Sequence, residues 1–276
     1  MKYTAPLKYT LVRNHMKTII LSGGLGYRLK EETEFKPKPM VLIGGKPILW
    51  HIMKIYASAG FNDFIIALGY KGDMIKEYFL NQKHFLNNFS ISTKTGKTTL
   101  HKGSRNENRS DNFKITFVDT GEETMPGERI LRVKNFIPKT DKHFMVTYGD
   151  GVADIDIRKV VNFHKKQGTI GTITGVHPRS KYGLLKINDK GIVESFKEKP
   201  VLKEHTNGGF MVFKRGFFNY IKPGEFEHEA LKRLVDKRQL SVYTHDGFWH
   251  SMDTYPDVDN LNRIWAEDPK WKVWKD

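Results

Sequence analysis

The sequence contains no cysteine. Disulfide bridges, zinc–thiolate sites and cysteine nucleophiles are therefore excluded. It also lacks any run of about 18 apolar residues, so we expect no transmembrane helix and no membrane partner. Residues 1–15 are polar and basic without an apolar centre, unlike a secretory signal. These features together predict a cytoplasmic protein.

Acidic residues are scarce relative to basic ones. The chain has 31 Asp and Glu against 46 Lys and Arg, a net charge of +15. Such a surplus attracts anions, including nucleotides, sugar phosphates and nucleic acid. The basic residues are spread along the chain, and no zinc-finger or RNA-recognition motif accompanies them. We therefore expect small phosphorylated ligands and no nucleic acid, with a nucleic-acid-binding module as an alternative that rests on charge alone.

The chain length of 276 residues suits one large α/β domain. Met16 offers a second start, so we predict residues 1–15 to be a disordered basic extension and residues 16–276 to form the domain. In the first half, short apolar segments alternate with helical patterns, which is typical of a parallel sheet with helices on both faces. The predicted strands are residues 19–22, 64–68, 115–118 and 143–147, and the predicted helices are 47–59, 73–80 and 157–167.

The second half is richer in β-structure. Residues 94–112 before it are polar and are expected to form a hairpin or loop. We expect a Rossmann-like three-layer sandwich with a mixed, mostly parallel sheet and a smaller β-rich part. The predicted elements here are strands at 169–176, 184–187, 192–196, 210–213 and 240–244, and a helix at 227–237.

Two groups of ring side chains outside the motifs have structural interpretations. His51 and His164 are expected on a helix surface or at the edge of the core. Three C-terminal tryptophans are expected to pack on a surface or against a partner subunit. These are Trp265, Trp271 and Trp274.

The strongest motif is the glycine run Gly23-Gly24-Leu25-Gly26, which follows a short apolar segment. A buried strand that ends in a glycine turn presents backbone N–H groups to a phosphate. The spacing matches neither G-x-G-x-x-G nor a P-loop. Arg28 and Lys38 bring positive charge to the same region, and the prolines on both sides of Lys38 restrain it. These residues predict a polyphosphate site.

Two carboxylates are candidate ligands of Mg²⁺, the cofactor that nucleotide chemistry usually needs. Asp150 follows an apolar strand in Tyr-Gly-Asp-Gly, and ligands of open α/β sheets bind at the carboxyl ends of strands. It is the first candidate, although glycine on both sides also suits a turn aspartate. Asp253 is the second. For an anionic substrate the candidates are Lys199, Asn207 and Gly208, with a plain turn as the alternative.

Five segments together resemble the sugar nucleotidyltransferases, over residues 16 to about 274. They are Leu-Ser-Gly-Gly-Leu-Gly-Tyr-Arg-Leu, Lys-Pro-Lys-Pro-Met-Val, Gly-Gly-Lys-Pro-Ile-Leu-Trp-His-Ile-Met, Tyr-Gly-Asp-Gly-Val-Ala-Asp and Gly-Phe-Trp-His-Ser-Met-Asp-Thr. Residues 49–53, 118–121 and 148–154 resemble the cytidylyltransferase branch. The resemblance implies transfer of a cytidylyl group from CTP to a sugar 1-phosphate, glucose 1-phosphate in that branch, with Mg²⁺ and release of pyrophosphate. It also implies a homo-oligomer.

The resemblance assigns roles residue by residue. Arg28, Lys38 and Asp150 would be catalytic, and Asp150 and Asp253 would hold Mg²⁺. The implied nucleotide-binding residues are Leu21, Ser22, Gly23, Gly24, Leu25, Gly26, Tyr27, Arg28, Lys38, Thr124, Arg129 and Gly149.

The chain departs from the family pattern at two positions. Tyr27 replaces the usual threonine and is expected either to crowd the triphosphate or to turn outward. Glu128 replaces a glycine and is expected to add negative charge beside Arg129. Another nucleotide or phosphorylated acceptor, and a non-catalytic nucleotide-binding protein, therefore stay as alternatives.

Overall fold

The computed structural model describes residues 16–82, 84, 87–101 and 111–275. The expected disordered extension at 1–15 and part of the expected loop at 94–112, residues 102–110, lie outside this range. No helix among the described residues is long and apolar enough to cross a membrane.

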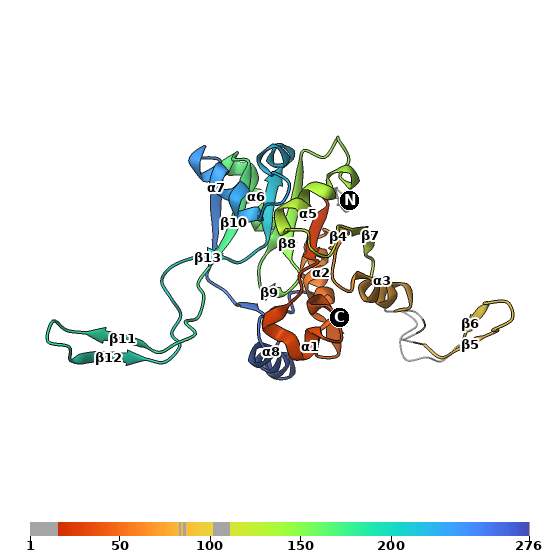
Figure 1. The fold of residues 1–276 in the computed structure, drawn as a ribbon, viewed down its shortest axis with the longest axis horizontal. Coiled ribbons are helices and arrows are strands. Elements are labelled where there is room, and N and C mark those ends of the chain that lie inside the picture. Colours follow the sequence, from red (N-terminus) through yellow and green to blue (C-terminus); the bar gives the residue numbers. More distant parts are fainter. Residues whose placement is uncertain (1–15, 83, 85–86, 102–110, 276) are drawn as a thin grey trace, which may run out of the picture.

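One sheet of eight strands runs through the body of the molecule (Figure 1). The order is β13-β10-β14-β8-β1-β4-β7. β13 and β14 pair with one side of β10, and β15 pairs with its other side. β14 is antiparallel to β8 and β10, whereas the pairs from β8 through β1 and β4 to β7 are parallel. The strands are β1 (Thr18–Ser22), β4 (Asp63–Leu68), β7 (Lys114–Asp119), β8 (His143–Tyr148), β10 (Gly171–Val176), β13 (Thr206–Asn207), β14 (Met211–Lys214) and β15 (Leu240–His245).

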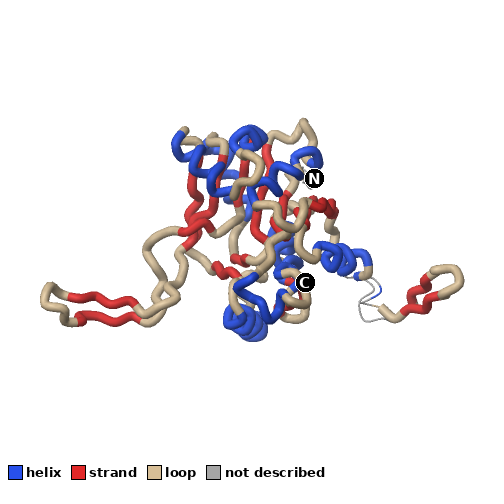
Figure 2. Tube along the Cα trace, viewed as in Figure 1, coloured by secondary structure: helices blue, strands red, loops and turns tan. Residues whose placement is uncertain are grey.

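Helices cover both faces of this sheet (Figure 2). Side chains of β1 alternate between two cores: Ile20 packs with α2 and α6, whereas Ile19 and Leu21 pack with α5 and α7. This alternation is the period-two pattern of a strand buried on both faces. The predicted mixed three-layer sandwich is confirmed. The helices are α1 (Lys30–Thr33), α2 (Ile48–Ser58), α3 (Gly72–Leu80), α5 (Pro126–Arg132), α6 (Ile157–Gln167), α7 (Glu227–Asp236) and α8 (Tyr255–Glu267).

Two hairpins project from opposite sides of the body (Figures 1 and 2). One is β5–β6 and the other is β11–β12, and every residue of the first hairpin's strands is exposed. The second hairpin carries exposed apolar side chains such as Ile192 and Phe196. Short pairs complete the fold. These strands are β2 (Leu42–Ile43), β3 (Lys46–Pro47), β5 (Phe89–Ile91), β6 (Thr98–Leu100), β9 (Gly151–Ala153), β11 (Leu184–Ile187), β12 (Val193–Lys197) and β16 (Trp249–Ser251).

Of the two positions expected for the histidines, the helix surface is wrong, because both side chains are fully buried. His51 Nε2 lies 2.8 Å from the carbonyl oxygen of Ile43, so it donates there. Its Nδ1 lies 3.3 Å from Trp271 Nε1, whose N–H it accepts. Burial is the main cause that lowers the pKa of His51 to about 4. His164 Nδ1 lies 2.8 Å from the Thr172 hydroxyl oxygen, and burial likewise lowers its pKa to about 4.

The expected packing of the C-terminal tryptophans on a surface or a partner subunit is wrong for Trp271 and Trp274. Trp271 and Trp274 are buried within this chain. The rings of Trp265, Trp271 and Trp274 all lie within 6.1 Å of the His51 ring, measured between centroids. The aromatic C-terminal segment therefore completes the core around α2.

Candidate active site

The glycine run lies at the carboxyl end of β1. All five residues of β1 are buried, and the chain turns at Gly26, whose φ of 68° is left-handed. A short 3-10 helix, η1 (Tyr27–Leu29), follows directly. β8 runs parallel beside β1 with Leu21 opposite Tyr148, and the Gly149 N–H donates to the Leu21 carbonyl oxygen over 3.0 Å. The glycine turn and the Tyr-Gly-Asp-Gly turn therefore lie side by side at the carboxyl ends of two neighbouring parallel strands.

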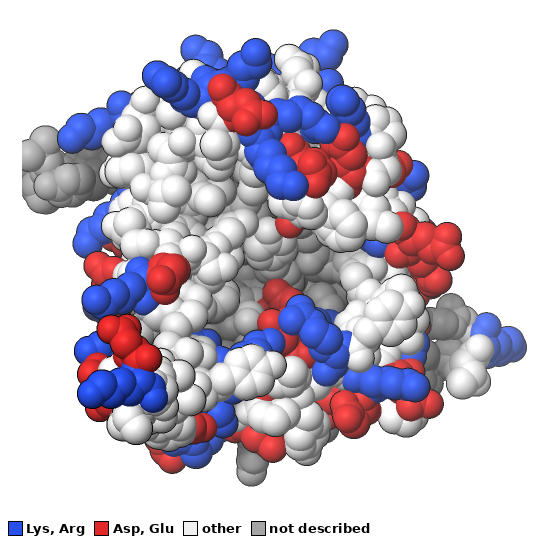
Figure 3. Space-filling view, turned by 60° about the vertical axis from the view of Figure 1, so that its left-hand side comes forward, with Lys and Arg blue, Asp and Glu red and all other residues white. Residues whose placement is uncertain are grey.

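A cavity of about 650 Å³ opens at these strand ends. Figure 3 shows the molecule hollowed on one face, with acidic and basic side chains meeting at the rim. The predicted nucleotide-binding residues all line the cavity, together with residues that the motifs did not single out, such as Tyr148 and Phe226. The lining is Leu21–Arg28, Lys38, Pro39, Glu122–Pro126, Arg129, Tyr148–Asp150 and Phe226.

A cluster of two cations and two carboxylates lies at the cavity. The Lys38 ammonium donates to Asp150 Oδ2 over 2.6 Å and to Asp253 Oδ1 over 2.8 Å. Arg28 Nη2 donates to the same Asp253 oxygen over 2.7 Å. The fold thus brings together four residues that are up to 225 positions apart in the sequence.

The contacts of this cluster shift the pKa values of Lys38 and Asp253. Burial alone would lower the pKa of Lys38, but the charge and hydrogen bond of Asp150, with those of Asp253, raise it above its ordinary value. Burial would raise the pKa of Asp253, but Lys38, Arg28 and the Ser251 hydroxyl outweigh that effect and lower it. Both groups therefore carry their charges at neutral pH.

A short antiparallel pair explains why Asp150 and Asp253 meet. β9 begins directly after Asp150 and pairs with β16, with Gly151 opposite Ser251. The Met252 N–H donates to the Asp150 carbonyl oxygen over 2.8 Å. Asp253 is then fixed by the start of α8, where Asp257 accepts from the backbone N–H groups of Asp253 and Thr254.

The cluster fits a divalent cation. One cation, the Lys38 ammonium, is shared by oxygens of both carboxylates. Carboxylate oxygens are the ligands that Mg²⁺ prefers, and it is commonly held by one or two of them together with substrate phosphates. Asp150 and Asp253 are therefore the residues that would hold it.

Arg129 lies in the wall of the cavity but is only 3% exposed. Its Nη1 donates to the carbonyl oxygens of Leu68 and Gly121 and to the Thr120 hydroxyl oxygen, over 2.6 to 3.0 Å. Its Nη2 donates to the carbonyl oxygens of Gly23 and Glu122 over 3.0 and 2.8 Å. The guanidinium thus ties the glycine turn to the end of β4 and to the loop after β7.

Gly23 leaves room for that guanidinium. A Cβ atom on Gly23 would lie 2.2 Å from Arg129 Cζ, well inside van der Waals contact. Gly24 has nothing within 4 Å of the same position. The first glycine of the run is therefore required by packing, which the sequence pattern alone did not indicate.

Tyr148 is a cavity residue that sequence reasoning missed, although it stands directly before the Gly-Asp-Gly motif. Its hydroxyl donates to Glu227 Oε1 over 2.8 Å and accepts from Asn207 Nδ2 over 3.2 Å. Burial, followed by the charge of Glu227, raises the pKa of Tyr148, so its hydroxyl keeps its proton. Asn207, predicted to bind the sugar phosphate, is thereby joined to the cavity wall.

The comparisons with known proteins agree on one family. A model of the nucleotidyl transferase family matches residues 17–276. The chain belongs to this family. Glucose-1-phosphate cytidylyltransferase of Salmonella typhimurium is 43% identical over 264 residues, which span 94% of this chain and 100% of that protein.

Other similar proteins share less of the sequence with this chain. Mannose-1-phosphate guanyltransferase of Schizosaccharomyces pombe is 27% identical over 85% of this chain and 60% of its own length. Among solved structures, HddC from Yersinia pseudotuberculosis superposes with a TM-score of 0.65 at 23% identity, over 91% of this chain and 99% of that one. This last likeness concerns the fold.

The structure places the two departures from the family pattern at and beside the cavity. Tyr27 lines it but is 78% exposed, which agrees with the outward orientation rather than crowding. Glu128 pairs with Arg132 over 2.6 Å and also accepts from the Gly224 N–H, and its negative charge also acts on Arg129, as expected.

The remaining sugar-phosphate candidates stay predictions. The Gly208 carbonyl oxygen accepts from Trp249 Nε1 over 2.9 Å, at the strand pair that carries Asp253. Lys199 lies beyond the exposed hairpin β11–β12, 64% exposed beside Glu198, and is not among the residues that line the cavity.

Proposed function

We propose that the chain transfers a cytidylyl group from CTP to glucose 1-phosphate, giving CDP-glucose and pyrophosphate. The observation that carries this proposal is the 43% identity to a glucose-1-phosphate cytidylyltransferase over that protein's whole length. The meeting of Arg28, Lys38, Asp150 and Asp253 at the cavity supports it. Both substrates are phosphorylated metabolites, which supports a cytoplasmic site of action.

The reaction needs alignment and charge rather than a strong base. A phosphate oxygen of the sugar attacks the α-phosphorus of CTP, a new P–O bond forms, and the bond to the β-phosphate oxygen breaks as pyrophosphate leaves. The attacking oxygen is already anionic, so the protein has to bring two anions together and stabilise the charge of the transition state. In this proposal the backbone of the glycine turn cradles the triphosphate, and Arg28 and Lys38 neutralise its charge.

Asp150 and Asp253 would hold Mg²⁺ in the proposed enzyme. When bound, the ion supplies positive charge to the phosphates. Arg129 contributes by holding the glycine turn in place, since its donors are engaged by the protein's own carbonyl groups.

The test is pyrophosphate release with Mg²⁺ and glucose 1-phosphate, for CTP, UTP, dTTP, ATP and GTP separately. We expect release with CTP and its loss in Asp150→Ala. Asp236→Ala removes an exposed carboxylate at the end of α7 and serves as the matched control, with activity retained. Release with another nucleotide only would replace CTP in the proposal. No release with any nucleotide, from a folded protein, would contradict the proposed reaction.

We also propose that the enzyme works as a homo-oligomer. The apolar side chains exposed on hairpin β11–β12 support this, with Ile192 at 62% and Phe196 at 63% exposure. Light scattering after size exclusion would give the mass. A mass of 32.0 kDa, that of one chain, would contradict it.

A further inference from the structure

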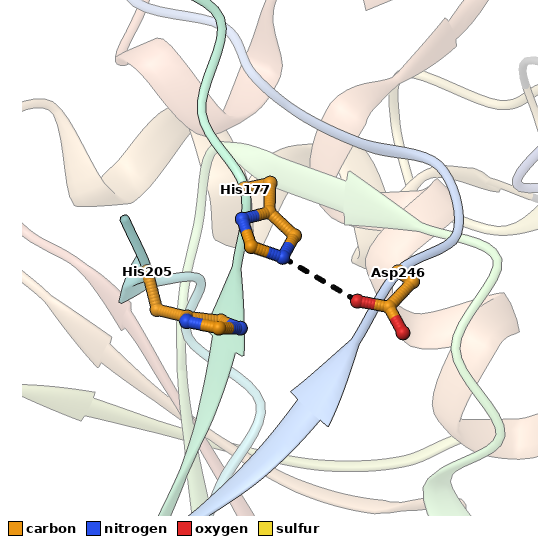
Figure 4. A group of neighbouring side chains, drawn as sticks. All are labelled: His177, His205 and Asp246. Atoms are coloured by element: carbon orange, nitrogen blue, oxygen red, sulfur yellow. Dashed lines mark ion pairs between the residues drawn. The ribbon is translucent and has the colours of Figure 1, made fainter. Parts of the chain in front are cut away.

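A second group of metal-ligating side chains lies away from the carboxylates of the active site. His177 follows β10, His205 precedes β13, and Asp246 follows β15. These three strands are neighbours in the sheet, and Val176 is opposite both Thr206 and His245. The next position along β10 therefore brings His177 level with His205 on one side and with Asp246 on the other. Figure 4 shows the three side chains converging.

The distances within this group suit a metal ion. His177, His205 and Asp246 each offer one ligand atom, and these atoms all lie within 4.8 Å of one another. His177 Nε2 and Asp246 Oδ1 are 3.5 Å apart. In a tetrahedral zinc site with bonds of about 2.1 Å, neighbouring ligand atoms lie about 3.4 Å apart. His205 and Asp246 are exposed, so an ion can enter from solvent.

A hydrogen bond behind His177 fixes the tautomer that a metal requires. His177 Nδ1 lies 3.3 Å from the Glu204 carbonyl oxygen, which can only accept, so Nδ1 carries the proton. In the neutral ring the lone pair of Nε2 then faces the Asp246 carboxylate. Two acceptors that face each other call for a cation between them. A backbone carbonyl that accepts from the other ring nitrogen is the usual support of a metal-bound histidine.

The spacing of the two rings also suits a shared metal ion. The rings of His177 and His205 are 4.1 Å apart between centroids. The ligand atoms of both rings and of Asp246 lie within 4.8 Å of one another, so one divalent ion can contact all three side chains. Imidazole nitrogen with one carboxylate oxygen suits Zn²⁺, while Mg²⁺ prefers oxygen ligands alone.

We propose that His177, His205 and Asp246 form a zinc-binding site. Its place in the fold suggests what it does. His177 and His205 are the two residues that flank segment 178–204, which carries hairpin β11–β12. Asp246 lies in the loop that leads through β16 to Asp253. A bound ion therefore ties the root of the hairpin to the segment that places an active-site carboxylate.

The test is zinc binding by the whole chain, stripped with a chelator and carrying no polyhistidine tag. Zn²⁺ is titrated in millimolar Mg²⁺, which occupies oxygen-only sites, and binding is followed with a zinc indicator and by metal analysis after dialysis. We expect one zinc per chain with micromolar or tighter affinity. His205→Ala and Asp246→Ala should each weaken zinc binding at least tenfold. The double variant should no longer bind the one zinc ion per chain.

Two controls distinguish this site from other zinc ligands. His228→Ala removes an exposed histidine that is also beside a carboxylate, Glu229, and should leave binding unchanged. Asp253→Ala should also leave it unchanged, because the active-site carboxylates are a separate site. Cobalt in place of zinc should give visible absorption bands that His205→Ala abolishes. Circular dichroism checks that each variant is folded.

Three results of the zinc titration would contradict the proposal. No zinc bound at tens of micromolar would overturn the proposal. Zinc bound equally by the wild type and by a folded His205→Ala, Asp246→Ala double variant would also overturn it. Zinc lost in Asp253→Ala but kept in the double variant would assign the metal to the active site instead.

Discussion

Two arginines in the wall of one cavity differ in what their charge can do. The Arg28 side chain is 66% exposed and donates to Asp253, itself a candidate metal ligand. Arg129 is 3% exposed and donates to four backbone carbonyl groups and one hydroxyl group. A guanidinium bound in this way cannot turn toward a phosphate without releasing the loops that it holds. Arg28 is therefore available to substrate, and Arg129 maintains the shape of the site.

Removing Arg28 should produce the largest loss of activity and little loss of stability. We expect Arg28→Ala to lower kcat/KM by about 10², or about 3 kcal/mol, because a charge aimed at the transition state is lost. The free energy of unfolding should change by less than about 1 kcal/mol, since exposed ion pairs contribute little. Pyrophosphate release and urea unfolding measure the two. Arg28→Lys, which keeps the charge, should lose less activity, and an Ala variant as active as the wild type would contradict the assignment.

Removing Arg129 should mainly affect stability. In Arg129→Ala five hydrogen bonds are lost, including those to the carbonyl groups of Gly121 and Glu122, and we expect the free energy of unfolding to fall by about 2 to 3 kcal/mol. Urea unfolding measures this. Arg132→Ala, which removes a half-exposed neighbour, should cost about 1 kcal/mol or less. If Arg129→Ala kept full stability but lost nucleotide affinity, the arginine would be a ligand residue and the contrast with Arg28 would disappear.

A double-mutant cycle tests whether Gly23 is needed because of Arg129. Gly23→Ala places a Cβ 2.2 Å from Arg129 Cζ, so we expect it to cost about 2 kcal/mol of stability. In the Arg129→Ala background the clash is absent, and the cost should fall by at least about 1 kcal/mol. Gly24→Ala is the matched control, because its Cβ meets nothing within 4 Å. Additive costs for Gly23→Ala and Arg129→Ala would show that the glycine serves the backbone alone.

The sequence predicted the elements whose cause is local. β1 and α6 follow from buried apolar runs and helical periodicity, and the observed α6 has the predicted bounds 157–167. The glycine run and Asp150 were found because each lies at a strand end. The roles that depend on distant partners were not predictable. Nothing near Arg129 in the sequence reveals that its guanidinium donates a hydrogen bond to the Gly23 carbonyl oxygen. The burial of His51 likewise depends on tryptophans more than 200 residues away.

The smallest expected effect is that of acid, which should weaken the contribution of Asp253 to stability but not that of Arg129. The pKa of Asp253 is lowered from its ordinary value of 3.8, so its ionised form stabilises the folded state above that pH. That contribution is lost as the pH falls below 3.8 and through the folded-state pKa. The carbonyl groups that accept from Arg129 do not titrate in this range.

The stability difference between the wild type and Asp253→Asn should therefore shrink as the pH is lowered from 7 to 3. The difference between the wild type and Arg129→Ala should stay constant over the same range. Urea unfolding at each pH measures both. Lys38 sets the limit at high pH. Its pKa is raised above 10.5, so it stays charged, and the stability difference between the wild type and Asp253→Asn should change in base only above that pH. Parallel changes of both differences with pH would mean that Arg129 depends on a titrating group, and that its isolation from the charged cluster is incomplete.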